Sequence, residues 1–254
     1  MSYQPTTRGI QTMEIENTIP DDAALLSSEL EVLRAGQRLA LLYDRYGKRL
    51  AATTSFGLQA SIMLHLISRH APGIPVIFID TGYHFPETYR YAEQLGEMLG
   101  IDLRFAQPAM TSARQEALYG RLWEQGKEGL DRYALINKIE PMNRALKELG
   151  ADVWLSGLRR SQSSTRSRRA FAERQKSTLK VYPILDWADA QVSAYMAEHQ
   201  LPPHPLAAMG YATMGDWHST VPLDEDGDAE TTRFNGQKYE CGLHLDSGRG
   251  DFQI

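Results

Sequence analysis

The stretch IPVIFID, residues 74–80, decides the fold class of this chain. It is a continuous apolar run that ends in an acid, which is typical of a strand buried on both faces of a sheet. The segment PETYRYAEQLGEMLG (86–100) follows, and its pattern is helical, with Pro at the first helical position and Gly at the end. IDLRFA (101–106) is another strand pattern. A strand, a helix and a strand in succession predict a parallel pair joined by a crossover.

The same alternation continues on both sides of this unit. Further strands are predicted at RLAATTS (49–55), DVWLSG (152–157) and TLKVYPI (178–184), and helices at 21–47, 57–70, 112–149 and 186–200. The pattern predicts an α/β fold, a mostly parallel sheet with helices on both faces. Residues 1–22 are polar and are interpreted as a loose leader, 23–200 as the α/β domain, and 201–254 as a mobile C-terminal tail.

Composition narrows the function classes. The net charge of −5 gives no reason to expect nucleic acid as a partner, and the sequence contains no apolar run of the length that crosses a membrane. The start of the chain lacks the pattern of a signal peptide, so we expect a cytoplasmic protein. A single cysteine cannot form an intramolecular disulfide or supply the ligands of an iron–sulfur cluster. The histidines have no recognisable metal-binding spacing, and no metal is expected.

Three polar segments follow predicted strands, where parallel sheets bind their ligands. TTSFGLQAS (53–61) is either an anion-binding loop at a helix N-terminus or an ordinary turn capped by Ser55. In DTGYHFPET (80–88), Asp80 either accepts hydrogen bonds from a ribose or adenine, or belongs to an ordinary turn. Both alternatives stay open for both segments.

The third segment, GLRRSQSSTRSRR (157–169), concentrates positive charge. It holds five arginines from Arg159 onward and no acid. Because like charges repel, we expect an exposed cluster that adds nothing to folding. Arginine pairs bidentately with phosphate or sulfate, so an anion site is favoured over a solvated loop or a nucleic-acid contact.

The only cysteine, Cys241, lies in YECGLH (239–244), within the polar tail. A lone thiol there is either an inert surface group or a nucleophile. Arg233, Lys238 and His244 are nearby cations that would raise the fraction of reactive thiolate.

Five segments, in this order, give the chain a family resemblance: TSFGLQA, DTGYHFPETYR, NKIEPMNRAL, GLRRSQS and ECGLH. From about residue 40 to 244 the chain resembles the phosphoadenylyl-sulfate (PAPS) reductases of assimilatory sulfate reduction, which supply cysteine biosynthesis. The resemblance implies a Rossmann-like fold of the adenine-nucleotide alpha-hydrolase type and a homodimer. It also implies reduction of PAPS to sulfite and adenosine 3′,5′-bisphosphate, with thioredoxin or glutaredoxin as electron donor.

The resemblance also implies residue roles. Cys241 would attack the sulfonyl sulfur of PAPS, carry an S-sulfocysteine and be released by thioredoxin. The nucleotide-binding domain would be 23–200, and the mobile tail would carry the cysteine between nucleotide and thioredoxin. By resemblance the substrate-binding residues would be Ser55, Phe56, Gly57, Asp80, Thr81, Lys138, Gly157, Arg159, Arg160, Arg166, Arg233 and His244.

Departures from the family pattern leave alternatives. Val221 stands where relatives often have Arg. Sister enzymes that reduce adenylyl sulfate (APS) carry cluster cysteines, at positions that look like Tyr133-Ala134 and Asp216…Ser219 here. Their absence favours PAPS, although a cluster-free APS reductase remains an alternative. Two rivals are an ATP-cleaving ligase or pyrophosphatase, whose loop acid is missing here, and a non-catalytic adenine-nucleotide sensor.

Overall fold

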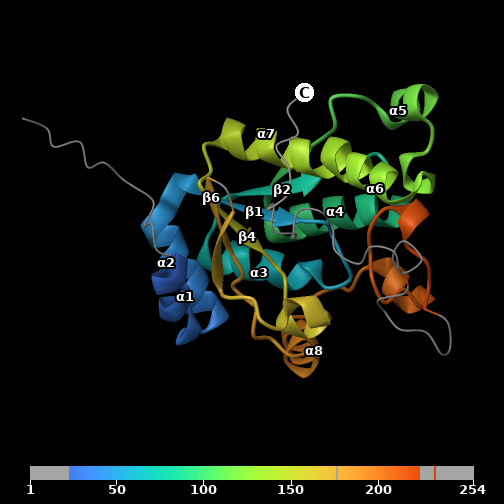
Figure 1. The fold of residues 1–254 in the computed structure, drawn as a ribbon. Coiled ribbons are helices and arrows are strands. Elements are labelled where there is room, and N and C mark those ends of the chain that lie inside the picture. Colours follow the sequence, from blue (N-terminus) through green and yellow to red (C-terminus); the bar gives the residue numbers. More distant parts are fainter. Residues whose placement is uncertain (1–22, 176, 224–231, 233–254) are drawn as a thin grey trace, which may run out of the picture.

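A computed structural model describes residues 23–175, 177–223 and 232 of the chain (Figure 1). The central feature is a six-stranded sheet in the order β3-β2-β1-β4-β6-β5. Its strands are β1 (Leu50–Thr54), β2 (Pro75–Ile79), β3 (Asp102–Ala106), β4 (Val153–Ser156), β5 (Ala172–Gln175) and β6 (Thr178–Val181). All neighbours pair in parallel except β5, which runs antiparallel to β6. The predicted mostly parallel sheet is confirmed.

Helices connect the strands at the places that the sequence predicts. The α-helices are α1 (Ala23–Glu31), α2 (Ala35–Tyr46), α3 (Ala60–His70), α4 (Pro86–Leu99), α5 (Ser112–Tyr119), α6 (Gly126–Ala134), α7 (Glu140–Leu149) and α8 (Asp189–Glu198). A π-helical turn, η3 (Leu135–Ile139), joins α6 to α7. Short 3₁₀ turns are η1 (Gly47–Arg49), η2 (Leu122–Glu124), η4 (Arg160–Gln162), η5 (Ser164–Arg166), η6 (Pro205–Met209) and η7 (Trp217–Ser219).

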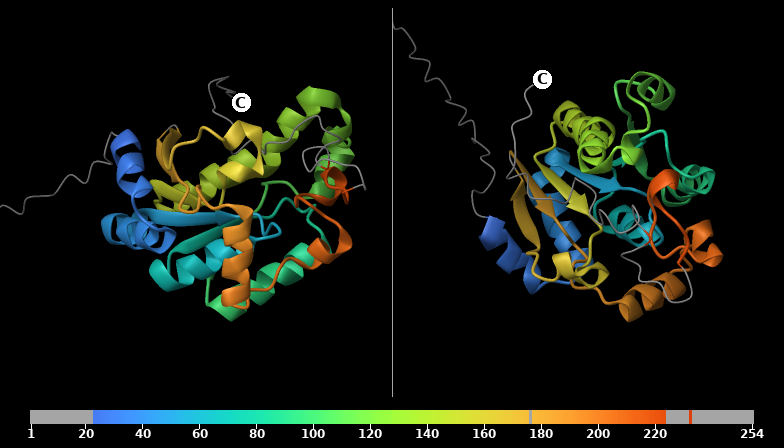
Figure 2. Two further views of the ribbon diagram at one scale, coloured as in Figure 1. Left: turned by 90° about the horizontal axis from the view of Figure 1, so that it is seen from below. Right: turned by 45° about the vertical axis from the view of Figure 1, so that its right-hand side comes forward.

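Alternate residues of β1, β2 and β4 enter two different hydrophobic cores. Leu50 and Ala52 of β1 pack into the larger core with α2, α3 and α4, whereas Ala51 between them packs against α7. Figures 1 and 2 show the sheet between α7 on one side and α3 and α4 on the other. Because both faces are covered, the strands must be apolar throughout, which is why IPVIFID reads as a continuous run.

The strand order has one reversal, between β1 and β4. From β1 the chain crosses through α3 to β2 and through α4 to β3, moving outward on one side. It then returns through α7, on the opposite face, to place β4 on the other side of β1. The loops after β1 and β4 both line a crevice at this reversal, at the carboxyl end of the sheet.

The structure adds a strand that the sequence does not predict. β5 has the sequence AERQ, which contains no apolar run, but it pairs with β6 at the edge of the sheet. An edge strand with polar residues gives no apolar pattern, which explains the omission. The strand predicted at 178–184 ends at Val181, and the helix predicted at 186–200 spans Asp189–Glu198.

The first part of the predicted tail, residues 201–223, packs against the domain. The hydroxyl of Tyr91 donates to the carbonyl of Pro202 (2.8 Å), and His204 is fully buried beside Thr88 (3.0 Å). Burial lowers the pKa of His204 to about 4, so the ring stays neutral. The backbone N–H of Leu206 donates to its Nδ1 (3.1 Å), which leaves Nε2 to donate to Thr88. Residues 201–223 are therefore packed as part of the domain. Cys241 follows this segment in the sequence.

Candidate functional site

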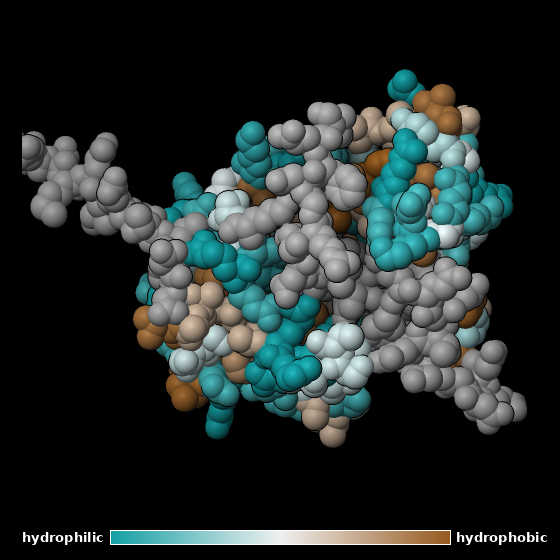
Figure 3. All heavy atoms as spheres, in the orientation of Figure 1, coloured by the Kyte–Doolittle hydropathy of each residue, from teal (hydrophilic) through white to brown (hydrophobic). Residues whose placement is uncertain are grey.

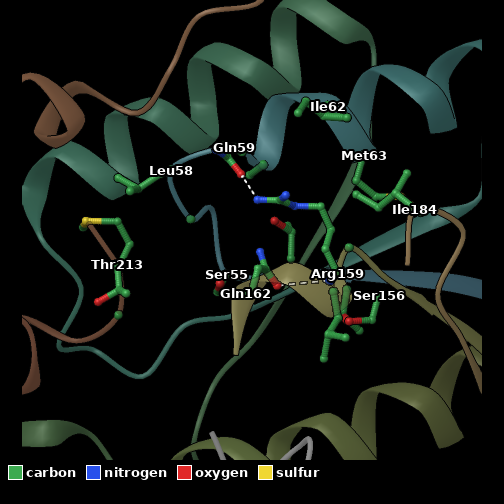
Figure 4. Close-up of a pocket in the computed structure, with 18 of the residues that line it drawn as sticks. Ser55, Leu58, Gln59, Ile62, Met63, Ser156, Arg159, Gln162, Ile184 and Thr213 are labelled. Carbon is green, nitrogen blue, oxygen red and sulfur yellow. Dashed lines mark hydrogen bonds between the residues drawn. The ribbon is translucent and has the colours of Figure 1, made fainter. Parts of the chain in front are cut away.

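A cavity of about 580 Å³ lies at the carboxyl ends of β1 and β4, where the strand order reverses. Thr53, Thr54 and Ser55 line it at the end of β1, and Ser156 and Gly157 line it at the end of β4. Figure 4 shows side chains of the β1–α3 loop and of the arginine-containing loop approaching each other across this space. Open α/β sheets bind ligands at such a switch point, and the volume suits a nucleotide-sized molecule.

The β1–α3 loop turns sharply at Phe56. This residue has a φ of 48°, and its backbone N–H donates to the hydroxyl of Thr54 (3.0 Å). Its ring is fully buried and packs edge-on against Phe78 (centroids 4.9 Å apart). A left-handed backbone at a residue other than Gly is costly, by roughly 1–2 kcal/mol. Burial of the ring offsets that cost, and the turn places Ser55 and Gly57 against the cavity while the Phe56 side chain lies outside it.

Arg159 departs from the expected exposed charge cluster. It is only 4% exposed, and its Nη1 donates to Asp189 Oδ1 (2.7 Å) while its Nη2 donates to Gln59 Oε1 (2.7 Å). The dashed lines in Figure 4 include the bond to Gln59. Arg159 thus links the arginine loop to the start of α3 and of α8. The expectation that the arginine cluster is exposed is wrong for this residue.

The other two predicted arginines of this loop point in different directions. Arg160 donates twice to the carbonyl of Arg169 (3.1 and 2.9 Å) and lies 5.1 Å over the ring of Phe171, outside the cavity lining. Arg166 lines the cavity, and its Nη1 donates to Gln162 Oε1 (2.6 Å). This bond holds the Arg166 guanidinium at the cavity wall.

Asp80 and Thr81 are adjacent in sequence, but only Thr81 lines the cavity. Asp80 accepts hydrogen bonds from Tyr89 (2.6 Å) and Gln107 (2.8 Å) and does not line the cavity. Its burial alone would raise its pKa, but these bonds and one from Gly82 lower the pKa below its ordinary value. Thr81 lines the cavity and is buried.

Lys138 reaches the cavity from the π-helical turn η3. Pro141 has no N–H to donate to the carbonyl of residue 137, so the helix is free to widen at this point. The buried Asn137 fixes the turn, since its amide exchanges two hydrogen bonds with Gln115 (2.9 and 3.1 Å). Single π turns are frequent at functional sites, because they re-aim one side chain.

Asp216 is a site residue that the sequence analysis does not identify. It lines the cavity, its side chain is 0% exposed, and Oδ2 lies 2.6 Å from Lys138 Nζ. Burial alone would raise its pKa, but Lys138, His84 and Thr81 hold the pKa far below the ordinary value. A single acid in ATMGDWHST gives no local signal of this role, because its burial depends on how residues 201–223 pack.

The remaining predicted residues divide into two groups. Gly157 lines the cavity, and a Cβ at this position would lie 3.4 Å from Met63 Cβ, so a larger residue would press on α3. Arg233, Cys241 and His244 fall outside the described residues.

Neither a membrane-spanning helix nor a metal-binding cluster occurs among the described residues. Among them, no helix is long and apolar enough to cross a membrane. In the same part of the chain, no group of three or more His, Cys, Asp or Glu side chains could hold a metal ion.

Comparison of sequences places the chain in a family. Residues 49–222 match the phosphoadenosine phosphosulfate reductase domain. A phosphoadenosine 5′-phosphosulfate reductase of Alkalilimnicola ehrlichii is 47% identical over 225 residues, covering 89% of this chain and 92% of that protein. The protein of the same name from Zymomonas mobilis is 46% identical over 237 residues, covering 92% and 97%.

Comparison of structures agrees with the sequences. The crystal structure of PAPS reductase from Candida auris, in a phosphate complex, has a TM-score of 0.68 and 31% identity, and the match covers 80% of this chain and 98% of that one. FMN adenylyltransferase from Candida glabrata has a TM-score of 0.55 at 12% identity, covering 81% and 75%, and so shares the fold alone. The two neighbours confirm the predicted fold class. The chain belongs to the phosphoadenosine phosphosulfate reductase family of oxidoreductases.

Proposed function

We propose that this chain reduces PAPS to sulfite and adenosine 3′,5′-bisphosphate through an S-sulfo intermediate on Cys241. The observation that carries the proposal is the family match over residues 49–222, which contains every described cation that lines the cavity. Cys241 lies beyond that match and is assigned by its place in ECGLH, the last of the five family-like segments.

The cavity supports an anionic nucleotide as ligand. Lys138, Arg159 and Arg166 line it, while the acids in the described lining are Asp189 and Asp216. Charge-assisted hydrogen bonds from such cations to phosphate and sulfate are short and strong. Thr53, Ser55 and Ser156 add hydroxyls near the strand ends, where ribose or phosphate oxygens would lie.

The proposed chemistry balances with one dithiol per turnover. The Cys241 thiolate attacks the sulfonyl sulfur of PAPS, an S–S bond forms, the S–O bond to the phosphate breaks, and adenosine 3′,5′-bisphosphate leaves. A thioredoxin or glutaredoxin thiolate then attacks the Cys241 sulfur and displaces sulfite. The second thiol of the donor resolves the mixed disulfide, so the donor loses two electrons and the sulfur of the sulfonate gains them.

Substrate choice is part of the proposal. The sequence holds one cysteine and cannot supply the four thiolates of a cluster, which favours PAPS over APS as substrate. A cluster-free reductase acting on APS would need the same nucleophile, so the two alternatives differ in substrate and not in mechanism.

The assembly and location are also proposals. We propose a homodimer in the cytoplasm, following the family resemblance. Leu25 (69% exposed) and Val32 (84% exposed) are apolar surface residues in and just after α1. Figure 3 shows hydrophobic groups on the side of the molecule where α1 and α2 lie, separated by hydrophilic residues. Light scattering of the purified protein tests the dimer.

The test is sulfite release from PAPS and from APS, each with reduced thioredoxin and, separately, with glutaredoxin. We expect release from PAPS to be faster by at least about tenfold, which corresponds to 1.4 kcal/mol. Turnover of APS equal to or faster than PAPS would assign the chain to the alternative substrate. Binding of PAPS without any sulfite would instead indicate a nucleotide sensor.

A further inference from the structure

Two opposite charges are buried against each other in the cavity wall. The Lys138 side chain is 10% exposed and the Asp216 side chain 0%, and their charged atoms lie 2.6 Å apart. A buried carboxylate or ammonium is unstable without a partner, because it has lost its hydration. Each of the two groups therefore depends on the other for its charge.

Asp216 is held in place by more than its partner. Thr81 Oγ1 donates to its Oδ1 (2.6 Å), and the backbone bridges to His84 in an isolated antiparallel pair. The N–H of Trp217 donates to the carbonyl of Tyr83 (2.8 Å), and the N–H of Ser219 donates back to the Asp216 carbonyl (3.0 Å). The carboxylate is thus fixed in position by residues 81–84 and 217–219, on both sides of the bridge.

Lys138 is less restrained along its own side chain. Its backbone belongs to η3, but the side chain has four rotatable bonds, and lysine is a point charge that does not set its own direction. Its Nζ lies 5.5 Å from the centre of the Tyr133 ring, on the side of the cavity where Asp216 lies. The fixed carboxylate, 2.6 Å away, holds the ammonium on this side of the cavity.

We propose that Asp216 is a positioning residue: it keeps Lys138 protonated and aimed along the cavity wall, where the ammonium donates to an anionic group of the nucleotide. This inference deepens the proposed function and rests on it. It assigns Asp216 no contact with the nucleotide, because the Asp216 side chain is buried and its two oxygens face Thr81 and Lys138.

Other titratable groups also face this pair. His84 Nδ1 lies 4.0 Å from Asp216 Oδ1. The phenols of Tyr83, Tyr89 and Tyr133 are also coupled to Asp216, and burial raises the pKa of each of them above its ordinary value. The three phenols therefore stay neutral over the neutral and mildly alkaline range. Because His84 also lies beside Asp216, the control variants retain it.

The test is the pH dependence of nucleotide binding in Asp216→Asn. Asparagine keeps the bond from Thr81 but presents an amide where Lys138 requires a negative charge. A buried ammonium without a counter-ion has a lowered pKa, by up to about 3–5 units. A lowered pKa means that Lys138 is charged at low pH and loses its proton as the pH rises. The Kd for adenosine 3′,5′-bisphosphate, measured by calorimetry from pH 6.5 to 9.5, should then rise with pH at least about tenfold more in this variant than in wild type.

Two control variants isolate the lysine. Asp189→Asn makes the same charge change at the other pair in the cavity wall, but Arg159 does not deprotonate, so its pH profile should parallel that of wild type. The double variant Lys138→Met with Asp216→Asn retains His84 but has no lysine to titrate, so the added pH dependence should disappear. Parallel profiles for wild type and Asp216→Asn would overturn the inference, as would persistence of the added dependence in the double variant.

A second pair of variants decides the question if Asp216→Asn does not fold. Thr81→Val removes one bond that orients the carboxylate and leaves both charges, while Thr81→Ser retains that bond. Weaker nucleotide binding in the valine variant, with recovery in the serine variant, supports positioning, and equal affinity in all three proteins contradicts it. Absence of nucleotide binding by wild type would overturn the proposed function, and is thus distinguishable from a failure of this inference.

Discussion

Two cation–carboxylate pairs in the described part of the cavity wall differ in the exposure of their carboxylates to water. Arg159 and Asp189 lie 2.7 Å apart, and the Asp189 side chain is 77% exposed. Lys138 and Asp216 lie 2.6 Å apart, and the Asp216 side chain is 0% exposed. The contact distances are nearly equal, but the hydrated carboxylate can do without its partner and the buried one cannot. Burial of the carboxylate, and not the contact distance, therefore decides how much each pair contributes to stability.

The comparison also separates the two cations. Arg159 is fixed by Asp189, Gln59, Ser161 and a backbone carbonyl, and its guanidinium cannot lose its charge in this pH range. Lys138 is a point charge on a flexible chain and can lose its proton when its partner is removed. Arg159 joins the arginine loop to the starts of α3 and α8. Lys138 and Asp216 instead place a paired positive and negative charge on one side of the cavity.

The largest expected effect is on stability, in Asp216→Asn. This change leaves Lys138 buried without its counter-charge, and breaking a buried pair costs about 3–5 kcal/mol. Urea unfolding of the variant and the wild type at pH 7 measures the difference in free energy of unfolding. The two curves should have the same dependence on denaturant concentration. A loss of less than about 1 kcal/mol would show that the buried pair behaves like an exposed one.

An intermediate effect is expected on binding, in Arg166→Ala. Arg166 lines the cavity, where its guanidinium can donate to an anionic ligand. We expect adenosine 3′,5′-bisphosphate to bind more weakly by about 1.5–3 kcal/mol, the range for a charge-assisted hydrogen bond. Arg168→Ala is the matched control, because Arg168 is in the same loop, is exposed and does not line the cavity. Equal losses of nucleotide affinity in both variants would indicate an effect of the overall positive charge of the loop and not a specific contact of Arg166.

The smallest effect is expected in Asp189→Asn. The Asp189 carboxylate is mostly hydrated, and the buried Arg159 retains its hydrogen bonds to Gln59, Ser161 and a backbone carbonyl, so the change should lower the free energy of unfolding by about 1 kcal/mol. The same urea experiment measures it beside Asp216→Asn. A loss of unfolding free energy as large as that of Asp216→Asn would mean that exposure of the carboxylate does not distinguish the two pairs.

The sequence predicts most of the fold for a physical reason. Strands covered on both faces must be apolar throughout, so β1, β2 and β4 appear as continuous runs between helical patterns. β5 is missed because an edge strand is stabilised by pairing with β6, and its residues Ala172–Gln175 carry no apolar pattern.

The candidate site was predictable where it depends on local sequence. The strand-end loops and the arginine segment contain Ser55, Gly57, Gly157 and Arg166, all of which the structure places at the cavity. Asp216 was not predictable, because nothing in ATMGDWHST indicates that tertiary packing buries the acid beside a lysine 78 positions earlier in the chain. For the same reason, the sequence did not indicate that the Phe56 ring enters the core or that Arg159 is buried.

The most direct test of the central claim is a single-turnover measurement with PAPS and no thioredoxin. The account predicts about one equivalent of adenosine 3′,5′-bisphosphate per active site, after which release stops. The protein should then carry the added mass of one sulfonate on the peptide that contains Cys241, and reduced thioredoxin should release that group as sulfite. Cys241→Ser should bind PAPS but give no burst and no added mass. A burst of nucleotide with an unmodified Cys241 peptide, or sulfite production by the serine variant near the wild-type rate, would contradict the account.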